Sequence, residues 1–283
     1  MNSCILFIFE GAKAEPNITI NLCQHLIETD GKRVVRASYG FNIYKLHKEL
    51  SKDPDLDIYE LLVEQINSKT TINKYDQSVL DIGDSENITD IYMFFDYDIH
   101  CTNASNIKLS DMLNRFDNPQ NDGLLCVSYP MVEALKHQEG KAPTYLTHSI
   151  LDLKNYKKWL NKSIREGNLD KRYQNWSDYT LEIWSEIIHT NLIRANKLTT
   201  DNFTLPKQTI EQIDIFNSQI SKHIPNNEVA VISGFPLMLL EFYGDNLATK
   251  TTIYTDSPFG NFINTIISTL VKFKNWFESM IKH

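Results

Sequence analysis

Two short acidic segments each follow a run of apolar residues. Glu10 comes directly after the run Cys4–Phe9, and Asp96 and Asp98 follow the run 91–95. Each run is typical of a buried strand, and open α/β sheets bind ligands outside the carboxyl ends of their strands. Side chains two residues apart on an extended chain face the same side, so we expect Asp96 and Asp98 to point at one cation. Together with Glu10 they predict a site for Mg²⁺, or alternatively Mn²⁺, of the kind that acts on phosphates.

The chemistry expected of this site is the cleavage of phosphodiester bonds. A Mg²⁺ ion held by Asp96 and Asp98 would neutralise charge on the phosphate and lower the pKa of a bound water. Glu10, on the neighbouring strand, would ligate the metal or act as a general acid or base. The sequence therefore predicts a metal-dependent hydrolase.

Further residues are candidates for supporting roles. Glu133 is a candidate fourth metal ligand, although an acid in the first turn of a helix is also favoured by the helix dipole alone. Lys13 is placed to touch the scissile phosphate. His100 is either a secondary proton carrier or an ordinary exposed loop histidine.

A basic stretch lies in the second half of the chain. Residues 154–176 hold seven cations, interleaved with the aromatic residues Tyr156, Trp159, Tyr173 and Trp176. Cations for phosphates and aromatic rings for bases are what a nucleic-acid track requires. The candidate binding residues are Lys157, Lys158, Lys162 and Arg165. The alternative is a solvated helix whose aromatic rings face the core.

Composition limits the class of protein. The chain has 283 residues, 42% of them hydrophobic, and a formal net charge of −8. An acidic chain is not a general nucleic-acid binder, so contacts with DNA or RNA must come from a local basic patch. The four cysteines lack CxxC spacing, and the apolar start has neither the length nor the basic leader of a signal peptide. We therefore expect a reduced, cytoplasmic protein without membrane spans.

The first 140 residues alternate strand-like and helix-like segments, which predicts an α/β fold with a mainly parallel sheet flanked by helices. The predicted strands are Cys4–Phe9, 33–39, 91–95 and 124–128. The predicted helices are 18–29, 41–50, 58–66, 109–116 and 131–136. Segments 10–17 and 67–89 are expected to be loops, and Ser110 is expected to cap the fourth helix.

The remainder, 141–283, is predicted to be a mostly helical extension packed on the first part. Its one expected strand is 228–232, followed by a helix at 237–243. A long C-terminal helix is expected at 258–281, with one broad apolar face. That face either covers the protein's own core or forms an interface with a second copy or a partner protein.

The motifs resemble those of a known family. Phe-Glu-Gly-Ala-Lys-Ala-Glu-Pro-Asn at 9–17 resembles the Glu-Gly-x-Lys-Thr-Glu-Pro opening of the RloB group of TOPRIM proteins. TOPRIM domains carry a glutamate after the first strand and Asp-x-Asp after a later one, and here Glu10 and Asp96 with Asp98 match. Ser-Tyr-Pro-Met-Val-Glu at 128–133 is similar to the next element of that group. Glu15 matches its motif, and the alternative role for Glu15 is to orient the loop by accepting backbone hydrogen bonds. Ala12 stands where related sequences often carry an acid.

The resemblance covers residues 4–140 and implies a Mg²⁺-dependent nuclease. Proteins of the RloB and OLD groups often belong to bacterial phage-defence systems, and OLD-like systems imply a partner ATPase, since this chain lacks a phosphate-binding Gly-x-x-x-x-Gly-Lys-Ser/Thr loop. One alternative is a TOPRIM-like module that senses or binds a partner with little or no catalysis. Another is a haloacid-dehalogenase-like phosphatase, although its Asp-x-Asp normally follows the first strand and precedes Gly-Thr rather than Ile99 and His100.

Overall fold

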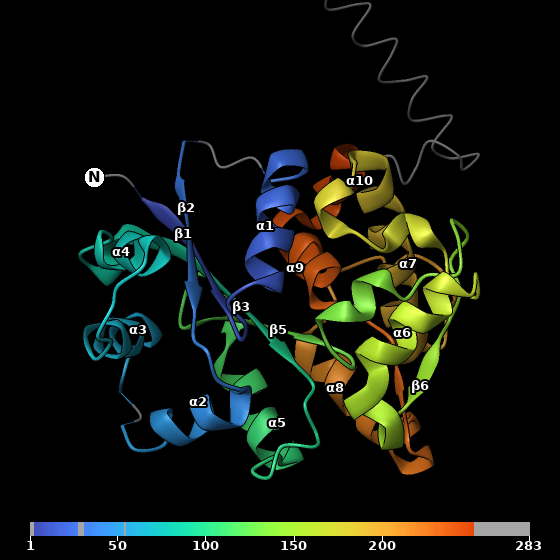
Figure 1. The fold of residues 1–283 in the computed structure, drawn as a ribbon, viewed down its shortest axis with the longest axis horizontal. Helices are drawn as coiled ribbons and strands as arrows, with labels where there is room; N and C mark the ends of the chain where they lie inside the picture. Colours follow the sequence, from blue (N-terminus) through green and yellow to red (C-terminus); the bar gives the residue numbers. More distant parts are fainter. Residues whose placement is uncertain (1–2, 28–30, 54, 252–283) are drawn as a thin grey trace, which may run out of the picture.

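A five-stranded sheet forms the centre of the computed structural model, which describes residues 3–27, 31–53 and 55–251. The strand order is β2-β1-β3-β5-β4, and all pairs are parallel except β4 with β5. The strands are β1 (Cys4–Phe9), β2 (Arg33–Ser38), β3 (Ile88–Asp96), β4 (Asp117–Asn118) and β5 (Gly123–Ser128). Helices flank this sheet, so the predicted α/β class is confirmed (Figure 1).

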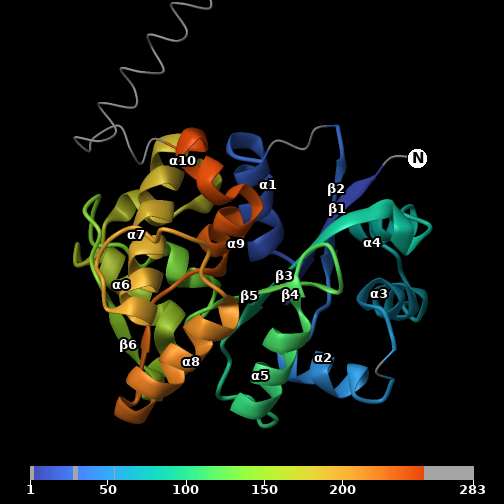
Figure 2. The ribbon, with the colours of Figure 1, turned by 180° about the vertical axis from the view of Figure 1, so that it is seen from behind.

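The helices lie on both sides of the sheet. In both views, α1 (Ala14–His25) and α9 (Gly234–Tyr243) lie on one side, and α3 (Ile58–Asn67) and α4 (Lys74–Leu80) lie on the other (Figures 1 and 2). The other α-helices are α2 (Ile43–Leu50), α5 (Asn106–Arg115), α6 (Tyr156–Arg165), α7 (Leu181–Thr200), α8 (Gln212–Lys222) and α10 (Leu247–Lys250). Short 3-10 helices connect them, of which η2 (Val132–Lys136) matters for the site. Within the described residues, no helix has the length and apolar character needed to cross a membrane.

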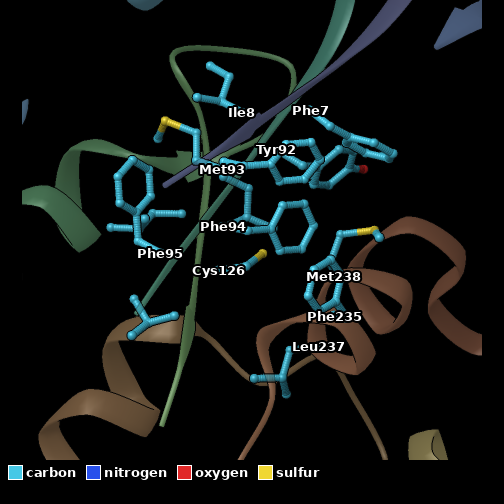
Figure 3. Packing of buried hydrophobic residues seen from close by; sticks show 14 of the residues in the cluster. Phe7, Ile8, Tyr92, Met93, Phe94, Phe95, Cys126, Phe235, Leu237 and Met238 are labelled. Atoms are coloured by element: carbon cyan, nitrogen blue, oxygen red, sulfur yellow. The ribbon is translucent and has the colours of Figure 1, made fainter. Parts of the chain in front are cut away.

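The sheet buries side chains on both faces, as its apolar strands predict. Phe94 points toward α9 and stacks on Phe235, with ring centroids 4.3 Å apart, whereas Met93 points to the opposite side (Figure 3). Gly234 permits this close approach, because a Cβ there would lie 3.0 Å from the backbone of Cys126. Much of the helical extension is thus packed on the sheet in the main hydrophobic core, while α6 has a smaller cluster of its own around Leu160.

Two segments expected to be loops contain helices. Helix α1 begins at Ala14 rather than at residue 18, because Pro16 lies in its first turn, where the missing N–H has no intrahelical partner to lose. Helix α4 lies inside the expected loop 67–89. A capping box starts it: Asn73 accepts from the Asp76 backbone N–H, and the Asp76 carboxylate accepts from the Asn73 backbone N–H.

Three further expectations need correction. Ser105, not Ser110, caps α5 by accepting from the Lys108 backbone N–H. The segment expected to be an α-helix at 131–136 is the 3-10 helix η2. The described part of the extension, up to residue 251, contains two strands rather than one, because β6 (Thr147–Ser149) pairs with β7 (Glu228–Ala230). The predicted helix 258–281 lies outside the described residues.

Candidate active site

The site begins where β1 and β3 end. Parallel strands end at one edge of the sheet, and the register pairs Phe9 with Phe94. The next residue, Glu10, donates its backbone N–H to the carbonyl of Phe94 at 3.0 Å. Its Oε2 accepts from the Asp96 backbone N–H at 3.2 Å. Glu10 is therefore held between the ends of the two central strands.

Asp96 links the sheet to the segment that carries Glu133. As the last residue of β3, Asp96 accepts a hydrogen bond at Oδ1 from the Val132 backbone N–H at 2.8 Å. This bond fixes the start of η2, where Glu133 follows and is only 3% exposed. The tertiary structure thus buries Glu133 beside Asp96.

A fourth carboxylate comes from the first turn of α1. Glu15 is buried and accepts the Gly11 backbone N–H at Oε1, 3.2 Å away. A Cβ at residue 11 would lie 2.8 Å from Glu15 Oε2, so a larger residue there would displace the end of the Glu15 side chain. Glu15 was not among the predicted metal ligands, and the start of α1 was predicted four residues later, at residue 18. An acid followed by proline is a helix-start signal that could have corrected it.

These four residues, Glu10, Glu15, Asp96 and Glu133, form what we call the carboxylate cluster. Burial is the main cause that raises the pKa of Glu10 to about 7, and the nearby charges of Asp98 and Glu15 raise it further against the hydrogen bond from Asp96. Burial and the other three members of the cluster also raise the pKa of Asp96. The cluster therefore gathers negative charge where water solvates it poorly.

One lysine of the helical extension reaches the cluster. Lys157, on α6, places Nζ 2.8 Å from Glu133 Oε1. The pKa of Lys157 is raised by this hydrogen bond and by the charge of Glu133, with smaller effects from Glu15 and Asp96. The ammonium group therefore lies within the field of three carboxylates and forms an ion pair with one.

The Asp98 carboxylate has different hydrogen-bond partners from the Asp96 carboxylate. Strand β3 ends at Asp96, and the backbone N–H of Asp98 donates back to the Asp96 carbonyl at 2.9 Å. The chain turns there, so the alternation of strand side chains no longer applies. The Asp98 carboxylate accepts from the His100 backbone N–H and the Cys101 thiol. It remains close enough to Glu10 to raise the pKa of that residue.

Lys13 and His100 lie beside the site without joining the cluster. Lys13 is exposed just before α1, and no side chain in the described ranges forms an ion pair or hydrogen bond with its ammonium group. His100 Nε2 lies 2.7 Å from the carbonyl oxygen of Ile150. The structure thus places Lys13 where it is open to a ligand, and engages the His100 ring with the backbone.

The basic stretch presents exposed cations on α6, whereas two of its four aromatic rings are buried and the other two, Trp159 and Trp176, are partly buried. Lys157, Lys158, Lys162 and Arg165 are all exposed. In contrast, Tyr156 is fully buried, and Tyr173 is 1% exposed. The cations of α6 suit phosphates, while these two rings belong to the core.

The donor set suits a hard cation, although the ligands are not assembled in this conformation. Among the described residues, no group of three or more His, Cys, Asp or Glu side chains is arranged to hold a metal ion. Mg²⁺ usually needs only one or two carboxylates, with water and substrate phosphate filling the remaining positions. Glu10 and Asp96, joined by a hydrogen bond and both carrying raised pKa values, match that requirement.

A separate cavity lies away from the carboxylate cluster. It has a volume of about 790 Å³ and is lined by polar residues of α7, α8 and the segment 202–210. None of its lining residues belongs to the carboxylate cluster.

Comparison with known proteins adds no family to this description. No family model, no curated protein and no solved structure matches the chain.

Proposed function

We propose that this protein is a Mg²⁺-dependent nuclease that cleaves phosphodiester bonds of DNA or RNA. The observation that supports it is the convergence of four carboxylates from three segments at the carboxyl edge of a parallel sheet, where such folds bind ligands. The exposed cations of α6 begin at Lys157, which already touches Glu133. They lie where they can hold the backbone of a nucleic acid whose phosphate is at the cluster.

In this proposal the residues have distinct roles. Glu10 and Asp96 hold the metal, with Glu133 and Asp98 as further ligands; the ion supplies charge neutralisation and an acidified water. Without metal the pKa of Glu10 is raised to about 7, so metal binding to Glu10 should displace a proton near neutral pH. In the alternative role Glu10 is the general acid or base and leaves the metal to the other carboxylates. Lys157, beside Glu133, and Lys13, in the loop that follows β1, neutralise phosphate charge.

The wider context is proposed on the resemblance alone. A nuclease of this kind belongs in a phage-defence system and works with a partner ATPase. The chain then supplies the cutting site, and the partner supplies nucleotide hydrolysis.

The test is a cleavage assay with single-stranded and duplex DNA and RNA and with transfer RNA, in Mg²⁺ or Mn²⁺. Asp96→Asn removes a cluster charge and should lower cleavage at least about a hundredfold. Asp90→Asn is the matched control, because Asp90 lies at the other end of the same strand, and it should change cleavage less than about threefold. Equal loss in both variants would show that the effect is structural and would contradict the proposal.

A binding or sensor subunit is the second candidate. The ion pair between Lys157 and Glu133 favours it, because an ammonium group already provides part of the positive charge that the cluster needs. Nucleic-acid binding without cleavage by wild type and Asp96→Asn alike would support this role. A phosphoaspartate trapped at Asp96 would instead indicate a phosphatase.

A further inference from the structure

A cavity of about 390 Å³ lies against β2, the strand at the edge of the sheet. Its walls come from the carboxyl half of β2 and the turn after it, the first turns of α1 and α4, and the end of α3. Ala12 and Gly40 both line it, and the Gly40 backbone N–H donates to the carbonyl of Glu10 at 3.1 Å. The cavity and the carboxylate cluster therefore share the loop that follows β1.

Aromatic rings form much of the cavity wall. Tyr39, Phe41 and Tyr75 all line it, and Phe41 is 42% exposed. The Phe41 ring meets Tyr39 edge-on, with centroids 5.8 Å apart, and Lys45 Nζ lies 3.0 Å from the Phe41 centroid. The Lys45 ammonium group covers one face of the Phe41 ring in a favourable cation–π contact, which leaves the other face for stacking on a flat ligand.

Polar groups surround these rings. Ser68 and Asn73 line the cavity, and so does Lys69, whose ammonium group pairs with Asp76 at 2.6 Å. Arg36 also lines it, held by hydrogen bonds from its guanidinium group to Thr19. Flat apolar walls with hydrogen-bonding groups at the rim match a heterocycle that has apolar faces and polar edges. The volume falls within the usual range for small-molecule sites.

We propose that this cavity binds a nucleobase, from the nucleotide next to the phosphate held at the carboxylate cluster. This inference rests on the proposed function, because it is the nucleic-acid strand that connects the two positions. Phe41 is also more open to a base than the rings of the basic stretch: Tyr156 and Tyr173 are buried, and Trp159 and Trp176 are partly buried, whereas Phe41 is exposed. Base binding here would make cleavage depend on sequence.

The test uses nucleosides, which lack phosphate and so do not depend on the metal site. Binding of adenosine, guanosine, cytidine and uridine to the whole chain would be measured by saturation-transfer NMR in the presence of a chelator. Ser68→Trp fills the cavity from an exposed position at the end of α3 and should weaken binding about tenfold. Phe41→Ala should weaken it similarly, and Phe41→Trp should retain it, because stacking needs only a ring.

The control is Ser51→Trp. Ser51 is the exposed residue after α2, as Ser68 is after α3, and both hydroxyls donate to a carbonyl of the preceding turn. Ser51 does not line the cavity, so its variant should bind nucleosides like wild type. Absence of binding by every nucleoside at millimolar concentration, or equal weakening in both serine variants, would overturn the inference.

The two proposals fail separately. If Ser68→Trp weakens nucleoside binding but the protein cuts no substrate, the base-binding proposal is supported and the nuclease proposal is contradicted. The opposite result is that the wild type cuts with metal and Ser68→Trp cuts at the same rate with the same sequence preference. That result would support the nuclease proposal and contradict the base-binding proposal.

Discussion

The two ends of β3 carry aspartates in opposite circumstances. At the amino end, the Asp90 carboxylate accepts from Lys32 Nζ at 3.4 Å and from the Thr89 hydroxyl at 2.7 Å. At the carboxyl end, Asp96 lies near three other carboxylates, and no lysine or arginine of the described residues is within ion-pair distance of it. One aspartate has its own counter-charge, and the other shares a crowded negative site.

The difference teaches how the fold distributes its charges. A single buried carboxylate with a cation is an ordinary structural arrangement. Several carboxylates held together by backbone hydrogen bonds destabilise the fold, because burial and mutual repulsion both oppose their ionisation. Such a cost is typical of sites kept for function rather than for stability. Three predictions test this contrast, from the largest expected effect to the smallest.

Metal binding should distinguish the two ends most strongly. At pH 8, Mn²⁺ or Mg²⁺ at about a hundred times its dissociation constant should stabilise the wild type by about 2.7 kcal/mol. For a chain of this size that corresponds to a rise in Tm of about 4–5 °C. Thermal unfolding should show the rise in Asp90→Asn and little of it in Asp96→Asn. A similar rise in both variants would place the metal elsewhere.

The pH dependence of stability should reveal the strain at Glu10. Its pKa is raised from 4.5 to about 7, so between these values the folded protein holds a proton that the unfolded chain has lost. Stability without metal should therefore fall as the pH rises through this window. Glu10→Gln, which keeps an acceptor for the Asp96 N–H, should be more stable than wild type by about 2 kcal/mol at pH 8 and similar to it near pH 4.5.

Urea unfolding with a chelator present would measure this difference at each pH. Glu60→Gln, an exposed change on α3, is the control and should not reproduce it. A Glu10→Gln variant that is less stable than wild type at pH 8 would show that the Glu10 carboxylate is well accommodated, and would contradict the contrast.

The smallest effect on stability is expected at Lys157. Its side chain is 67% exposed, so Lys157→Met should lower the free energy of unfolding by less than about 1 kcal/mol. It should nevertheless weaken nucleic-acid binding at low salt more than Lys158→Met, its exposed neighbour on α6, because only Lys157 reaches the cluster. Electrophoretic mobility shifts with a chelator present would compare the two. If both variants weaken binding equally, Lys157 contributes only as one of several surface cations.

Several strands and the fold class could be predicted from the sequence, because buried elements require local patterns of apolar residues. Apolar runs such as Cys4–Phe9 can be satisfied only inside a sheet covered on both faces, so β1, β3 and β5 and the parallel α/β class were predictable. Helix α4 was missed because its sequence is polar, and a capping box rather than an apolar stripe starts it. The start of α1 was placed at residue 18 rather than Ala14, because large apolar residues at helical spacing begin only at Ile18.

The sequence by itself determined that Glu10 and Asp96 lie at one edge of the sheet, because each directly follows a buried parallel strand and such strands end together. It did not determine which other side chains would meet them. The turn after Asp96 directs Asp98 toward Cys101, and the hydrogen bond to Val132 brings Glu133 inward. Lys157 and the cavity beside Phe41 depend on contacts between segments far apart in the chain, which only tertiary packing sets.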